Sequence, residues 1–170
     1  MISTDYVRTM ARYNAWMNGK LYAACERLDD AQRKQDRGAF FRSLHSTLNH
    51  ILWGDYTWLG RFTQGGPLES AYPKAAIGTD LFDDWEALKA ARSAMDADIL
   101  AWSEHVDADW LAADFSWYSG LSKAVRTRPA WLLVAHLFNH HTHHRGQATT
   151  LLSQLGIDPG DTDLMLMPLD

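Results

Sequence analysis

The sequence of 170 residues contains one cysteine, no apolar run that approaches the length of a membrane span, and no basic run. A helical span needs about 20 apolar residues, so we expect no membrane partner. The first residues lack the basic and apolar segments of a signal peptide. With Cys25 alone, no intramolecular disulfide is possible, and its place beside Ala23 and Ala24 indicates a packed thiol. We therefore expect a soluble cytoplasmic protein.

The charge balance also excludes a class of partner. The net charge is −5, which argues against a nucleic-acid surface and against binding to anionic membranes. The expected partner is a small-molecule substrate. The length suits one domain, so we treat residues 1–170 as a single unit. Eight tryptophans are many for this length, and we expect several in the core or in the wall of a pocket.

Several catalytic motifs are missing. The sequence has no Glu-x-x-His, which argues against a carboxylate-bridged di-iron bundle, and no His-Glu-x-x-His of the zincins. It also lacks a nucleophile elbow, a P-loop and a dinucleotide-binding fingerprint. The chemistry must therefore come from another cluster of side chains.

Histidine is concentrated in one segment, because five of the eight histidines lie between Pro129 and Gly156. Pro129 suits the first turn of a helix and Gly156 the position just past a helix end, which predicts one long helix between them. On that helix, residues that follow one another by three or four form an apolar stripe facing the core. The stripe contains Leu133, Leu137, His140, His144, Ala148, Leu151 and Leu155.

Two histidines occupy this stripe at a spacing typical of metal ligands. His140 and His144 are four residues apart, so both imidazoles lie on one helix face, pointed most directly inward. His136 and His143 fall to one side of the stripe, and His141 lies on the other flank. Two buried imidazoles side by side lose hydrogen-bonding capacity twice, whereas a shared metal ion satisfies both. The alternative is that both are core histidines with hydrogen-bonded partners.

Periodicity predicts three further long helices, at residues 4–28, 39–63 and about 79–105. Ser3 or Thr4 can cap the first, Gly65-Gly66-Pro67 stops the second, and Thr79 or Asp80 can cap the third. The stretch 106–128 predicts a short β-hairpin or an extended loop. We therefore expect an all-α fold, a four-helix bundle with that hairpin or loop before the last helix.

The second predicted helix carries two candidates for a third ligand, His45 and His50, near opposite edges of its apolar arc. Periodicity does not choose between them, although the His50 side carries small residues such as Gly54, which leave room beside a metal ion. Asp55 lies near the middle of the arc, where an uncompensated carboxylate is costly. We expect it to orient a ligand or to pair with Arg92, which interrupts the stripe of the third helix.

Residues 136–147 read HLFNHHTHHRGQ, and this segment resembles the signature of the DinB/YfiT-like family of metalloenzymes. The resemblance to this family extends over nearly the whole chain. The segment RYNAW at residues 12–16 resembles its opening, and FFRSLHSTLNHIL at residues 40–52, with Asp55, resembles its second helix. PGDTDL at residues 159–164 resembles the tail of one branch.

The resemblance implies a four-helix bundle, often a homodimer, that holds one divalent metal ion by three histidines. Carried over by position, these ligands are His50, His140 and His144, and it is the family that selects His50 over His45. His136, His141 and His143 then become non-ligands, although His136 and His143 remain candidates for the pocket wall. Gln147 and Asp55 are candidates for contacts behind the ligands. Zinc and nickel are the expected metals.

Two functions follow as hypotheses. Three histidine ligands leave a coordination position open, which is the pattern of catalytic sites and favours a metal-dependent hydrolase or thiol transferase. Related branches include thiol-dependent enzymes, which implies a low-molecular-weight thiol as a second cofactor. The alternative is a non-catalytic bundle that binds a metal ion or a small molecule.

Overall fold

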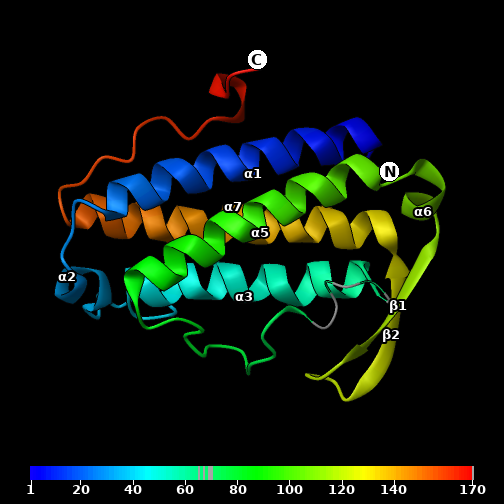
Figure 1. The fold of residues 1–170 in the computed structure, drawn as a ribbon, viewed down its shortest axis with the longest axis horizontal. Coiled ribbons are helices and arrows are strands. Elements are labelled where there is room, and N and C mark those ends of the chain that lie inside the picture. Colours follow the sequence, from blue (N-terminus) through cyan, green and yellow to red (C-terminus); the bar gives the residue numbers. More distant parts are fainter. Residues whose placement is uncertain (65, 67, 69–70, 170) are drawn as a thin grey trace.

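The structure, a computed structural model, describes residues 1–64, 66, 68 and 71–169. Four long helices lie alongside one another, with α1 against α5 and α7, and α3 against α7 and α5 (Figure 1). Short helices follow α1 and α5, and a 3₁₀ turn lies in the C-terminal tail. The helices are α1 (Thr4–Cys25), α2 (Asp30–Lys34), α3 (Leu44–Phe62), α5 (Trp85–His105), α6 (Ala108–Ala112), α7 (Ala130–Gln154) and η1 (Leu164–Leu166).

Capping residues decide where these helices begin. The side chains of Ser3, Ser43 and Asp84 each accept a hydrogen bond from a backbone N–H in the first turn. The predicted starts at residue 39 and at residues 79–80 are therefore wrong, because α3 begins only after Ser43 and α5 only after Asp84. The predicted stop at residues 65–67 falls partly outside the described residues. Helix α3 itself ends at Phe62.

The chain is not purely α-helical. Strands β1 (Asp114–Ser119) and β2 (Ala124–Pro129) form an antiparallel hairpin directly before α7, pairing Asp114 with Pro129 and Ser119 with Ala124. The expectation of an all-α fold is wrong in this respect, and the hairpin alternative for residues 106–128 is confirmed. Alternate side chains of β1 explain its position, since Phe115 packs edge-on against Phe62 and Trp117 against Trp58.

The core lies between the four long helices and contains mainly leucine, methionine and aromatic side chains. Cys25 is fully buried, and burial raises the pKa of its thiol to about 12, which confirms a packed thiol rather than a nucleophile. Among the described residues, no helix has the length and apolar character needed to cross a membrane.

The cap of α5 provides a test of the helix boundary. The backbone N–H of Ala87 donates to the Asp84 carboxylate at 2.8 Å. We expect Asp84→Ala to lower the free energy of unfolding by about 1 kcal/mol, measured by urea denaturation. The neighbouring variant Asp83→Ala removes only a surface ion pair to Lys34 and should cost less than about 0.5 kcal/mol. Equal effects would contradict the assigned cap.

Candidate metal centre

Three histidines from two facing helices meet at one point. His50 comes from α3, His140 and His144 come from α7, and their ligand nitrogens all lie within 4.8 Å of one another. The Nε2 atoms of His50 and His140 are 3.0 Å apart. Two nitrogens bound to one tetrahedral zinc ion lie about 3.3 Å apart, given Zn–N bonds of about 2.0–2.1 Å. This group could therefore hold a metal ion with little rearrangement.

A different contact fixes each of the three rings. His50 lies between Phe41 and Trp53, stacked on both, with ring centroids 3.9 Å and 5.4 Å away. His144 Nδ1 donates a hydrogen bond to Gln147 Oε1 at 2.9 Å, which leaves its Nε2 available as a ligand atom. His140 lies against Gly54, where an added Cβ would be 2.7 Å from the imidazole Cε1.

All three imidazoles are neutral at physiological pH. Burial, with the neighbouring His144, lowers the pKa of His50 to about 4, and burial with the other histidines lowers that of His140 to about 3. Burial also lowers the pKa of His144. Neutral imidazoles carry the lone pairs that a metal ion requires.

The other histidines considered as ligands or as pocket-wall residues lie outside the three-histidine group. His45 is buried and donates through Nε2 to the carbonyl of Phe82 at 2.8 Å, so the structure separates it from the cluster. His136 and His143 are exposed on α7 beside the cluster. His136 packs edge-on against Trp58, and the His143 ring lies 4.7 Å from that of His144.

The burial of His141 corrects the predicted orientation of α7. We expected His140 and His144 to point most directly inward, but His141 is fully buried whereas His140 is only partly so. The buried face of α7 passes through Leu137, His141 and Ala148, with His140 at its edge. Five of the seven stripe residues are buried as predicted, but the stripe placed His140 too far inward and omitted His141, whose buried polar partner is Asp55.

Asp55 is the centre of a buried charge cluster. Its carboxylate accepts hydrogen bonds from His141 Nε2 and from the Arg92 guanidinium, and both contacts are completely or almost completely buried. Burial raises the pKa of Asp55, but His141 and Arg92 together outweigh this effect and hold it at about 2. The predicted pairing with Arg92 is present, and Asp55 contacts His141 rather than one of the three clustered histidines.

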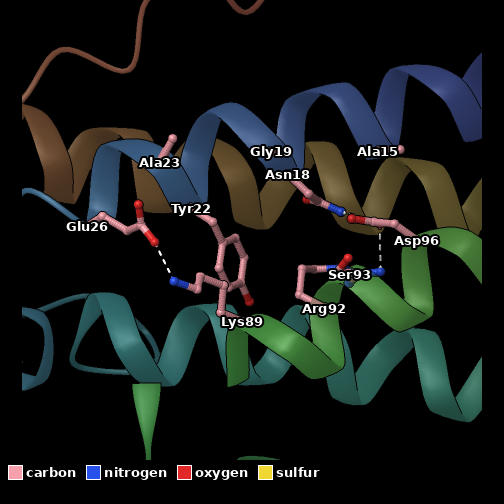
Figure 2. Close-up of a pocket in the computed structure, with 10 residues that line it drawn as sticks. All are labelled: Ala15, Asn18, Gly19, Tyr22, Ala23, Glu26, Lys89, Arg92, Ser93 and Asp96. Carbon is pink, nitrogen blue, oxygen red and sulfur yellow. Dashed lines mark hydrogen bonds and ion pairs between the residues drawn. The ribbon is translucent and has the colours of Figure 1, made fainter. Parts of the chain in front are cut away.

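The charge cluster around Asp55 continues into the groove between α1 and α5. Arg92 also pairs with Asp96 at 2.9 Å, and Asp96 accepts a hydrogen bond from Asn18 at 2.8 Å (Figure 2). Asn14 is shared, since its amide donates to Asp96 at 3.4 Å and its oxygen accepts from Arg145 of α7. All four long helices therefore contribute to one connected polar network.

Comparison with known proteins identifies the family of this chain. The chain matches the DinB family over residues 1–168. It belongs to the DinB family. Protein DinB of Bacillus subtilis (strain 168) is 26% identical over 165 residues, which cover 94% of this chain and 92% of that protein. In this DinB-family chain, the family signature on α7 contains two of the three clustered histidines, and the third lies on α3.

Several residues that position this site have no distinctive signal in the sequence. Phe41 and Trp53 enclose His50, but nothing in the local sequence distinguishes them from the other aromatic residues of this segment. Asn14 and Asn18 lie on the buried face of α1, and a polar residue at a core position was the available signal. Arg145 gave the same signal on α7, because a buried guanidinium requires a partner.

The charge cluster predicts a specific acid sensitivity. Asp55 has a pKa of about 2 in the folded protein, against roughly 3.9 when unfolded. Because the folded value is lower, its contribution to stability is complete above the unfolded pKa and is lost as the pH falls through the folded pKa. Between pH 5 and pH 3, the wild type should lose about 1 kcal/mol more unfolding free energy than Asp55→Asn does.

The same variant tests the cluster at neutral pH. Asp55→Asn should cost roughly 3–5 kcal/mol by urea denaturation, because it leaves the buried Arg92 without its anion. Asp5→Asn is the control, since that carboxylate is 90% exposed and should change stability by less than about 1 kcal/mol. A loss below about 1 kcal/mol for Asp55→Asn would show that the cluster does not hold the helices together.

Gly54 gives a matched pair of variants for the three-histidine group. In Gly54→Ala the new methyl group collides with His140, so we expect zinc affinity to fall by about tenfold or more in chelator competition. Gly60→Ala lies on the same helix, gains the same helix propensity and meets its nearest atom, in Tyr72, only at 3.6 Å. Its zinc affinity should be unchanged, and equal losses in both variants would argue against the role of Gly54.

Proposed function

We propose that this chain is a divalent-metal-dependent enzyme with a mononuclear site formed by His50, His140 and His144, acting as a hydrolase or a thiol S-transferase on a small molecule. The observation that carries the proposal is the convergence of three neutral imidazoles from facing helices. Membership of the DinB family supports it. His140 is partly exposed, and we propose that a small molecule reaches the group from that side.

The donor set fits a zinc or nickel ion. Imidazole nitrogens suit both metals, and three protein ligands leave at least one position open. When bound, a divalent ion would supply Lewis-acid activation of a water molecule or of a low-molecular-weight thiol. Gln147 holds His144 in the tautomer with its lone pair on Nε2, because the amide oxygen accepts from Nδ1–H.

Aromatic side chains lie beside the group. Phe41 and Trp53 cover the two faces of His50. Trp58 packs against both Trp117 of the hairpin and the exposed His136, whose ring centroid lies 6.0 Å from that of His140. We propose that these rings form the wall against which a small substrate lies, with His136 and His143 at its edge.

We propose that α1, α3, α5 and α7 form a four-helix bundle of the DinB type within a single domain, residues 1–170. We also propose a cytoplasmic homodimer with no nucleic-acid partner. The apolar side chains of Met165 and Leu166 support a second copy as partner, since both are exposed in the tail.

The assignment of ligands is tested with paired histidine variants. His50→Ala, His140→Ala and His144→Ala should each lower bound zinc or nickel from about one ion per chain to near zero, by elemental analysis. His136→Ala and His143→Ala remove neighbouring imidazoles from the same helix and should retain the metal. Loss of metal in the controls, or its retention in the ligand variants, would contradict this assignment.

A non-catalytic metal-binding bundle is the second candidate. It is favoured by one observation, that Asp55 is already engaged by His141 and Arg92 and is therefore not free to act as a general base. Chelation would then lower the melting temperature without affecting any turnover. Turnover of thiol or ester substrates that disappears on chelation and returns with zinc would support the enzyme and exclude this alternative.

A further inference from the structure

A groove of ≈ 240 Å³ lies beside the three-histidine group, between α7 and the turn that precedes α3. It shares Gln147 with that group, since the same side chain accepts the hydrogen bond of His144. Along α7, Thr150 and Gln154 lie about 9 Å and 15 Å beyond His144. Its lining includes Arg37, Phe40, Gln147, Thr150, Leu151 and Gln154. We call it the Arg37 groove.

Arg37 is the charged residue of this lining, and no carboxylate balances it there. Its Nη2 donates to the neutral amide of Gln35 at 2.7 Å, and none of the ion pairs among the described residues involves it. Its Nε is buried and has no hydrogen-bond partner within the described part of the chain. The adjacent carboxylate of Asp36 accepts instead from the backbone N–H of Gly38 at 3.0 Å. A guanidinium with a free buried donor favours an anion, above all a carboxylate.

The turn that carries Arg37 is held in place before any ligand binds. The backbone N–H of Arg37 donates to the carbonyl oxygen of Arg42 at 2.9 Å, and the backbone N–H of Arg42 donates to the carbonyl oxygen of Ala39 at 2.8 Å. Arg42 has φ +66°, in the left-handed region that non-glycine residues rarely adopt. At the tip, Phe40 is 80% exposed and packs edge-on against Phe41, the ring stacked on His50. Strained turns of this kind concentrate at binding sites.

We propose that the Arg37 groove binds the carboxylate end of a substrate or thiol co-substrate whose reacting group lies at the three-histidine site. Arg37 binds the carboxylate, the apolar surfaces of Phe40 and Leu151 contact the connecting chain, and Gln147 lies between the two ends. The inference rests on the proposed function, because it places the reacting group at the histidines.

The test uses two thiols of equal length, 8-mercaptooctanoate and 8-mercapto-1-octanol, titrated into the zinc-loaded protein by calorimetry. The acid should bind the wild type about tenfold more tightly than the alcohol, as expected for one charge-assisted pair. Arg37→Gln should abolish that preference. Arg42→Gln removes an exposed cation from the same turn and should retain it. Titrating zinc-free protein with octanoate and with octyl phosphate, which both lack the thiol, tests whether the groove selects carboxylates over other anions.

Equal affinities for the acid and the alcohol in the wild type, or an unchanged preference in Arg37→Gln, would overturn the anion site. A preference for the phosphate would overturn the carboxylate assignment. Titration of zinc-free protein distinguishes the contact of the anion with Arg37 from the placement of the thiol at the histidines. If removing zinc leaves the affinity for the acid unchanged but Arg37→Gln still abolishes the preference, the placement of the thiol at the histidines is overturned while the anion contact stands.

Discussion

The structure depends on the buried carboxylate of Asp55. It joins three helices at one point, because it lies on α3, accepts from His141 of α7 and pairs with Arg92 of α5. Through Asp96 and Asn14 the same network reaches α1 and returns to Arg145 on α7. The buried carboxylate of Asp55 and the largely buried carboxylate of Asp96 are thus matched by two buried guanidinium groups, those of Arg92 and Arg145. Because removing any one charge leaves another uncompensated, the network favours a single relative arrangement of the four helices.

This arrangement places the three-histidine group at the edge of the core instead of its centre. His141 occupies the inward position on α7, so its neighbour His140 lies on the flank, partly exposed and close to His50 across the α3–α7 contact. A group of ligands at the edge of a rigid scaffold combines fixed geometry with access for a small molecule. The rings are held mainly by packing, against Gly54 and between Phe41 and Trp53.

The long helices and the β-hairpin could be predicted from the sequence, because 3.6-residue periodicity, capping residues and alternating strand residues are local signals. The sequence predicted most of the buried face of α7 but not that His141 lies further inside than His140, since His140 fitted the apolar stripe better. Nor could spacing choose between His45 and His50, because that choice depends on the partner across the helix contact. His45 finds the Phe82 carbonyl and His50 finds His140. Contacts between segments distant in sequence have no local signal.

X-ray absorption at the zinc edge, on protein carrying one equivalent of zinc, would identify the atoms that bind the metal ion. If His50, His140 and His144 are the ligands, the spectrum will show three imidazole nitrogens at about 2.0–2.1 Å with one or two further light atoms, as for an open three-histidine site. A shell of about six oxygens without imidazole scattering would contradict this assignment, because it would show that zinc binds elsewhere and that these histidines are not its ligands.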